Sequence, residues 1–209
     1  MILGVDFDNT IVGYDRLFHA VAVERGLIPG DTEISKNAVR DHLRSVGKED
    51  DWTELQGYVY GLRMSEADPI PGAMECLTQL LRREIRIFII SHKTLHPYRG
   101  PKYDLHNAAW QWLEQQGFFD PSGVGLAKDA VFFETTKPEK LARIASVGCT
   151  HFIDDLPEIL TDSRFPDGVG RILFDPSGTA IAPNLPTATS WIQISGMLSP
   201  AREFRVISA

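Results

Sequence analysis

The sequence predicts an α/β fold in which helices cover both faces of a parallel sheet, with a small helical subdomain inserted after the first strand. Short apolar segments rich in Ile, Val and Phe alternate with segments of helical periodicity, and this alternation is typical of such a three-layer core. About eighty residues separate the first two apolar segments, which is far more than one crossover helix requires. The alternation therefore predicts the core, and the long connection predicts the insert.

Five segments are predicted strands because each is short, apolar and bounded by polar or turn-forming residues. They cover residues 2–6, 86–90, 130–133, 151–153 and 171–174. Helices of the core are predicted at 72–83, 103–116, 138–147 and 156–163. The ends of the third are the clearest, because Pro138 lies in its first turn and Gly148 follows its last.

The insert is predicted to contain three helices, at 15–25, 35–46 and 51–64. Glycine and proline residues between 26 and 30 separate the first two, and Gly47 ends the second. We therefore assign residues 14–70 to the inserted subdomain and residues 1–13 and 71–209 to the core. The insert would lie above the carboxyl end of the first strand.

Composition restricts the function further. The chain has 209 residues, a net charge of −7 and a sequence pI near 5.3. An acidic surface argues against sequence-independent binding of a nucleic acid polymer, because its phosphates would be repelled. No apolar run approaches the ~20 residues needed to cross a bilayer, and the N-terminus lacks the basic region of a secretory signal. Cys76 and Cys149 are far apart in apolar surroundings, as expected of buried thiols. We expect a cytoplasmic protein without a membrane partner, and the sequence does not specify its oligomeric state.

Polar residues follow four of the predicted strands. Carboxyl ends of parallel strands meet at one edge of the sheet, where α/β proteins keep their ligand sites. We therefore expect these side chains to converge. They are Asp6 and Asp8 after the first strand, Ser91 after the second, Lys137 before the helix at 138–147, and Asp154, Asp155 and Glu158 after the fourth.

This inventory suits a phosphate dianion and Mg²⁺, which prefers one or two carboxylates with water and phosphate oxygens. Asp6 would attack phosphorus and form an aspartyl-phosphate. Asp8 would protonate the leaving oxygen and then activate water. Ser91 and Lys137 would bind the phosphoryl oxygens. Taken alone, Lys137 could equally be a solvated surface lysine, and the pair Asp154–Asp155 could cap the next helix.

In order and position, four segments resemble the motifs of the haloacid dehalogenase-like (HAD) superfamily. They are Asp6-Phe-Asp8-Asn-Thr10, Ser91 after its strand, Lys137 before its helix, and Asp154-Asp155-Leu-Pro-Glu158. The resemblance implies a Rossmann-like core and an α-helical cap inserted between the first two motifs.

By position, the resemblance makes Asp6 the nucleophile and a Mg²⁺ ligand, and Asp8 the acid/base residue whose backbone carbonyl also binds the metal. It favours Asp155 as a further direct ligand, with Asp154 or Glu158 acting through water, and all three stay candidates. Asn9 and His92 are added as candidate phosphate-binding residues beside these motifs.

The second aspartate bears on the reaction class, because dehalogenating members of the superfamily lack it. We therefore expect a Mg²⁺-dependent phosphomonoester hydrolase acting on a small phosphorylated metabolite. A softer likeness to the deoxyribonucleotidase branch, carried by Ser91-His-Lys-Thr94 and the polar loop after it, makes a nucleotide one option. A phosphotransferase such as a sugar-phosphate mutase would use the same residues, and a non-catalytic binding protein could keep the fold.

Overall fold

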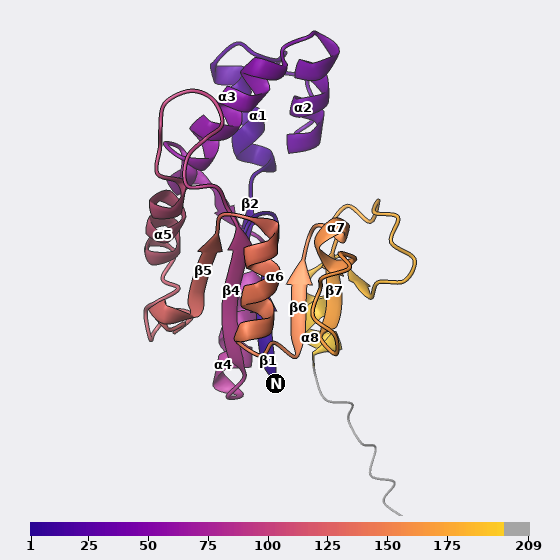
Figure 1. Cartoon of the computed structure of the whole chain (residues 1–209). Helices are drawn as coiled ribbons and strands as arrows, with labels where there is room; N and C mark the ends of the chain where they lie inside the picture. Colours follow the sequence, from indigo (N-terminus) through magenta and orange to yellow (C-terminus); the bar gives the residue numbers. More distant parts are fainter. Residues whose placement is uncertain (199–209) are drawn as a thin grey trace, which may run out of the picture.

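The computed structural model describes residues 1–198, and these residues form a six-stranded parallel sheet with helices on both faces (Figure 1). The strand order is β5-β4-β1-β6-β7-β8. The strands are β1 (Ile2–Val5), β4 (Arg86–His92), β5 (Val131–Glu134), β6 (His151–Asp154), β7 (Gly170–Phe174) and β8 (Thr187–Ala188). The predicted α/β fold is confirmed. The two-residue strand β8, which follows a segment rich in Pro, Gly, Ser and Thr, was not predicted.

Two buried clusters of apolar side chains lie on the two faces of the sheet. One joins Leu3 and Val5 of β1 to α4 (Ala73–Arg82), α5 (Leu105–Gln115) and α8 (Trp191–Met197). The other joins Phe152 of β6 to α6 (Lys137–Ser146) and α7 (Pro157–Leu160). Successive residues of each strand face opposite clusters, as the period of two requires.

The helices differ from the predicted ranges mainly at their ends. Helix α6 begins one residue earlier than predicted, and Thr136 and Glu139 form a capping box at its start. Helix α7 is shorter than the predicted 156–163 segment. No helix within residues 1–198 is long and apolar enough to cross a membrane.

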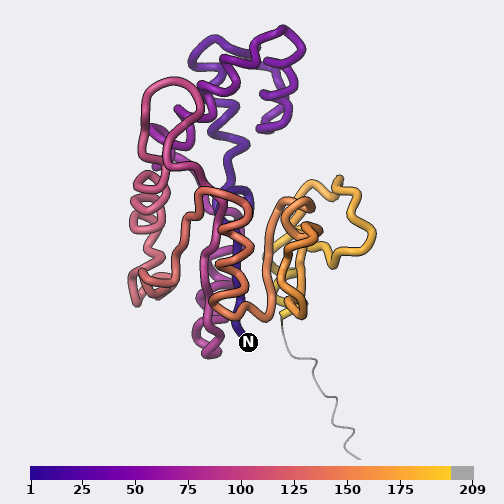
Figure 2. Tube along the Cα trace, viewed as in Figure 1, coloured from indigo at the N-terminus to yellow at the C-terminus, as the bar shows by residue number. Residues whose placement is uncertain are grey.

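Residues between β1 and β4 leave the core, form three helices and return (Figure 2). The helices are α1 (Asp15–Glu24), α2 (Lys36–Ser45) and α3 (Glu49–Tyr60), followed by a short 3₁₀ turn, Met64–Glu66. A two-stranded antiparallel ribbon of β2 (Val12–Gly13) and β3 (Asp68–Pro69) joins this helical cap to the core. The cap therefore stands directly above the carboxyl end of β1 (Figure 1).

One side of the cap packs tightly on the core. The loop between β4 and α5 lies against α3, where a Cβ added at Gly57 would come within 2.6 Å of Pro97 Cβ. Arg99 of this loop forms an ion pair with Asp50 of α3, with 3.0 Å between Nη2 and Oδ2. Helix α3 thus needs a glycine at this position in order to meet the loop.

The centre of the sheet has a similar close approach at Gly4. A Cβ at this residue would lie 2.4 Å from Cδ2 of Phe152, a side chain that is fully buried on the neighbouring strand. We predict that Gly4→Ala lowers the free energy of unfolding by about 1–3 kcal/mol, because overpacking forces the ring or the strand to move. Urea denaturation would measure it.

The control is Gly30→Ala, since a Cβ there meets nothing within 4 Å. It should change the free energy of unfolding by less than about 0.5 kcal/mol. Equal effects of the two substitutions would contradict the packing described for β1.

Candidate active site

The site begins in the turn that follows β1. The Asp6 N–H donates to the Ile153 carbonyl at 2.9 Å, which continues the pairing with β6 for one more residue. The chain then turns sharply through Asn9, whose φ of 55° lies in the left-handed region that asparagine tolerates better than most residues. This turn directs both aspartates to the carboxyl edge of the sheet.

Asp6 is buried and held by two donors. Ser91 Oγ donates to its Oδ1 at 2.9 Å, and Lys140 Nζ donates to the same oxygen at 2.6 Å. Lys140 Nζ also contacts Asp154 Oδ2 at 2.6 Å. Both donors fix the orientation of the Asp6 carboxylate through Oδ1, and no other described side chain bonds to it. One ammonium group thus links the ends of β1 and β6.

The lysine at this position corrects the sequence prediction. Lys137, expected beside the phosphate, is partly exposed and lies 3.6 Å from Glu158 Oε1 at the surface. Lys140 is only 1% exposed and contacts Asp6 and Asp154, so Lys140 and not Lys137 lies beside the carboxylates. The helical pattern holds a signal for it, because Lys140 lies next to Leu141 and four residues before Ile144, on the buried face of α6.

Three carboxylates meet beside this lysine. Asp6, Asp154 and Asp155 each offer an oxygen atom, and these atoms lie within 4.8 Å of one another. Asn9 Nδ2 donates to Asp155 Oδ2 at 3.1 Å, so Asn9 contacts this acidic group. Glu158 is not a member of the cluster. Of the three candidates after β6, Asp154 and Asp155 are therefore placed to act together with Asp6.

Burial is the main cause that raises the pKa of both Asp154 and Asp155, and the neighbouring carboxylates add to it. Lys140 opposes this effect at Asp154, and the Asn9 hydrogen bond opposes it at Asp155. Three carboxylates around one ammonium group leave an excess of negative charge when all are ionised. A set of oxygen ligands with such an excess fits a hard divalent cation.

Asp8 has a separate set of partners on the cap side of the site. Tyr14 Oη donates to its Oδ1 at 2.5 Å, and Lys93 Nζ lies 2.7 Å from its Oδ2. Burial, and then the charge of Asp8, raises the pKa of Tyr14 well above its ordinary value, so the phenol stays protonated as a donor. Lys93 is buried, with its ammonium group over the rings of Phe7 and Tyr60.

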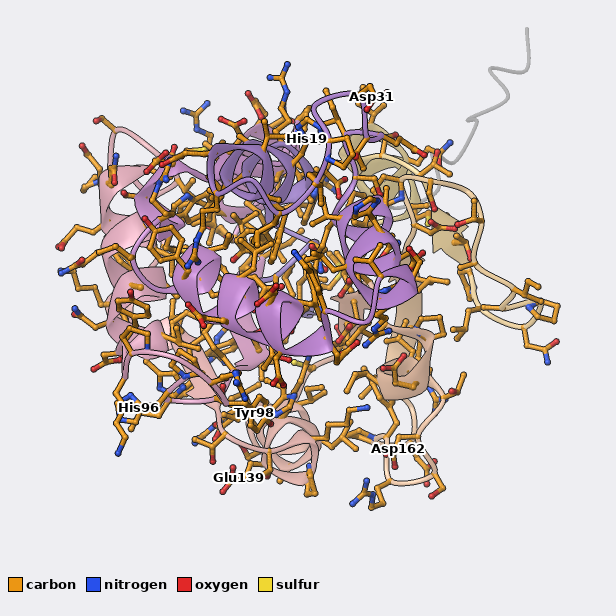
Figure 3. All side chains as sticks on the ribbon, turned by 90° about the horizontal axis from the view of Figure 1, so that it is seen from above. His19, Asp31, His96, Tyr98, Glu139 and Asp162 are labelled. Atoms are coloured by element: carbon orange, nitrogen blue, oxygen red, sulfur yellow. The ribbon has the colours of Figure 1, made fainter. Side chains whose placement is uncertain are left out.

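The remaining predicted residues of this region lie away from the carboxylates. The His92 ring contacts the Thr135 carbonyl oxygen at 3.2 Å, and burial lowers its pKa, so it is neutral near pH 7. The His96 ring contacts the Tyr103 carbonyl oxygen. In Figure 3, which looks down on the cap, His96 and the exposed Tyr98 lie at one edge of the cap helices. This loop contacts the cap rather than the carboxylate cluster.

A cavity of about 1270 Å³ opens on the other side of the cap. Asn9 and Asp155 line its inner end, and Lys36, Arg40 and Arg44 of α2 line its cap wall. The loop after β7, at residues 175–180, forms part of the opposite wall. The cavity therefore connects the carboxylate cluster to the space between cap and core.

The two lysines of α6 allow a direct test of this geometry. We predict that Lys140→Met lowers the free energy of unfolding by about 3 kcal/mol at pH 8 without metal, because Asp6 and Asp154 lose their buried counter-charge. Lys137→Met should change it by less than about 0.5 kcal/mol. Urea denaturation measures both free energies of unfolding. A larger decrease for Lys137→Met than for Lys140→Met would show that Lys140 is not the lysine that pairs with the buried carboxylates.

Comparison with known proteins gives one kind of match. No protein-family model and no curated protein sequence matches the chain. Solved structures match its fold over nearly the whole length. A HAD-superfamily hydrolase of subfamily IA from Geobacter sulfurreducens is 13% identical with a TM-score of 0.58, covering 95% of this chain and 96% of that one.

Two further structures extend this match. A HAD family hydrolase from Deinococcus radiodurans, solved with bound phosphate and sodium, is 15% identical with a TM-score of 0.56, covering 96% of this chain and 98% of that one. An L-2-haloacid dehalogenase from Xanthobacter autotrophicus is 13% identical with a TM-score of 0.52, covering 94% and 97%. At these identities the likeness concerns the fold. The chain has the fold of HAD-superfamily hydrolases, in agreement with the resemblance of its motifs.

Proposed function

We propose that this protein is a Mg²⁺-dependent phosphomonoester hydrolase that acts through an aspartyl-phosphate on Asp6. The observation that carries the proposal is the Asp6 carboxylate itself, buried and oriented by Ser91 and Lys140 beside Asp154 and Asp155. Solved proteins of this fold include hydrolases and dehalogenases, so the reaction class depends on the residues of the site and not on the fold.

The first step transfers the phosphoryl group to the protein. The Asp6 oxygen that accepts no hydrogen bond from the described side chains, Oδ2, attacks phosphorus. The bond from phosphorus to the ester oxygen breaks, and Asp8 gives its proton to that oxygen so that an alcohol leaves. Lys140 stays next to the Asp6 carboxyl group and offsets the negative charge of the phosphoryl oxygens.

The second step releases phosphate. Asp8, now a carboxylate, takes a proton from a water molecule whose oxygen attacks phosphorus. The bond between phosphorus and Asp6 breaks, and inorganic phosphate and the free Asp6 carboxylate result. Tyr14 and Lys93 hold Asp8 in one orientation through both steps.

Asp8 is also what favours phosphate chemistry over dehalogenation. Displacement of a halide needs a nucleophile but no acid for the leaving group, because halide ions leave unprotonated. An alkoxide is a poor leaving group and needs a proton. The contacts of Asp8 with Lys93 and Tyr14 hold its carboxyl group in one orientation, as proton transfer to a leaving group requires.

Asp6, Asp154 and Asp155 are the residues that would hold Mg²⁺, and their oxygen-only donor set fits this ion. When bound, the ion supplies positive charge that reduces the repulsion between a carboxylate and a phosphate dianion. Glu158 is left at the surface with Lys137. No observation favours the mutase or the non-catalytic protein over the hydrolase.

We predict that Asp6→Asn abolishes Mg²⁺-dependent hydrolysis of p-nitrophenyl phosphate, because an amide does not form the acyl phosphate. Asp8→Asn should lower kcat by at least about 100-fold, within the range of general acid–base catalysis. Release of p-nitrophenol measures the rate. The exposed cap residue Asp41 provides a control, since Asp41→Asn should keep the wild-type rate. Comparable rates in wild type and Asp6→Asn would refute the mechanism.

We also predict that Mg²⁺ raises the thermal stability of the wild-type protein. At 100 times its Kd, a ligand that binds only the folded state adds about 2.7 kcal/mol. The gain should be larger at pH 8 than at pH 6, because the raised pKa values of Asp154 and Asp155 make protons compete with the metal.

Asp155→Asn should lose most of this stabilisation, whereas Glu158→Gln should keep it. Differential scanning calorimetry with MgCl₂ and with EDTA measures both effects. If Glu158→Gln lost the stabilisation and Asp155→Asn kept it, the metal ligands would be assigned to the wrong residues.

A further inference from the structure

We propose that the substrate carries a second anionic group, a carboxylate or another phosphate, which Lys36 and Arg40 of the cap bind. This inference rests on the proposed function. It adds that the part of the substrate that leaves as an alcohol carries a negative charge. It is carried by the cation-lined cap wall of the cavity and by the unusual surroundings of Lys36.

The basic residues of α2 form one row. Lys36, Arg40 and Arg44 are spaced four residues apart, so they lie on the same face of the helix. All three line the cavity whose inner end is formed by Asn9 and Asp155. A molecule with its phosphoryl group at Asp6 would therefore extend its other end along this row.

The Lys36 side chain is partly buried in the wall of the cavity. Its ammonium group lies over the rings of Phe18 and Tyr60, at 5.6 and 5.5 Å from their centres. Aromatic faces attract a cation without neutralising it. Burial alone would lower the pKa of Lys36, but the Tyr60 hydroxyl and the carboxylates of Asp8 and Asp155 outweigh it and raise the pKa. The group is therefore a cation at neutral pH, near enough to Asp8 and Asp155 for their charges to act on it.

The charges of this wall are not equally engaged. Arg40 pairs with Asp41 and Arg44 with Glu49, both on the protein surface. Among the ion pairs of the described residues, Lys36 has no carboxylate partner. Its backbone N–H does bind Asp15, at 2.7 Å from Oδ1. Lys36 is therefore the one cation of the α2 row without a carboxylate partner among the described residues, and its ammonium group also contacts the Tyr60 hydroxyl. Arg16 of α1 lines the cavity too, but its side chain is exposed.

Acidic residues also line the cavity, but most already accept hydrogen bonds. Asp15 is bound by the Lys36 amide, and Glu49 by Arg44. Asp175 accepts from the Ser177 hydroxyl and the Ala180 N–H of its own loop. Asp68 of β3 is the remaining one outside the carboxylate cluster. Asp175 keeps its negative charge, since burial alone would raise its pKa but the hydrogen bonds from Ser177 and Ala180 outweigh burial and lower it. An anionic group of a ligand would therefore bind at the basic cap wall and not at the opposite wall.

Two pairs of substrates whose members differ by one anionic group test the proposal. The first is 3-phosphoglycerate against glycerol 3-phosphate, which differ by a carboxylate. The second is fructose 1,6-bisphosphate against fructose 6-phosphate, which differ by a phosphate. In each pair the measured quantity is the ratio of the two kcat/KM values with Mg²⁺. We expect wild type to favour the more anionic member of at least one pair by about tenfold or more.

Lys36→Met and Arg40→Gln should each reduce that ratio several-fold. A change in kcat/KM that is common to both members of a pair leaves the ratio unaffected. Lys48→Met is the matched control, because Lys48 lies in the same cap outside the cavity and pairs with Asp51. It should keep the wild-type ratio. Arg40 is partly exposed, so its variant provides a test even if Lys36→Met does not fold.

Ratios near one for wild type in both pairs would overturn the inference. So would equal losses for both members of a pair in Lys36→Met, which would mean that Lys36 contacts the transferred phosphoryl group itself. Hydrolysis of p-nitrophenyl phosphate distinguishes failure of this inference from failure of the proposed function. If it proceeds with flat ratios, only this inference fails, and if no Mg²⁺-dependent hydrolysis occurs, the proposed function fails and this inference fails with it.

Discussion

The contact of Lys140 with Asp6 and Asp154 is the constraint on which the site depends. It joins the end of β1, the end of β6 and helix α6, three segments that are distant in sequence. A charge buried this deeply costs several kcal/mol unless it is paired, so the two carboxylates and the ammonium group stabilise one another only when all three segments are in place. The orientation of Asp6 therefore depends on the correct packing of α6 on the sheet.

The cap is held differently on its two sides, and the cavity lies on only one of them. On one side α3 meets the loop after β4 through Gly57 and Pro97, and Arg99 adds an ion pair with Asp50. On the other side α2 faces the loop after β7 across the cavity. The cavity that reaches Asp155 is lined by the basic row of α2 and also by Glu49, Trp52 and Gln56 in the part of α3 before Gly57. The later part of α3, around Gly57, is the part that packs on the core.

Much of this arrangement could be predicted from the sequence, because it follows from one rule. Polar residues at the carboxyl ends of buried strands meet at one edge of a parallel sheet, and this rule predicted the positions of Asp6, Asp8, Ser91 and the pair Asp154–Asp155. Lys140 was missed because its role depends on the rotation of α6, which a strand-end rule does not give. Strand β8 has two residues and no periodicity to detect. The position of Lys36 depends on how the cap sits on the core, which local patterns do not contain.

The two aspartates of the first motif are only two residues apart, yet their environments come from different parts of the protein. Asp6 is oriented by core residues alone. Asp8 is oriented by Tyr14, which starts the cap, and by Lys93, which begins the loop that packs on α3. The Tyr60 ring of α3 contacts both partners, at 4.9 Å from the Tyr14 ring and 5.1 Å from Lys93 Nζ. The proposed nucleophile, Asp6, is thus oriented by the core, whereas the proposed acid/base residue, Asp8, is oriented only where cap and core pack together.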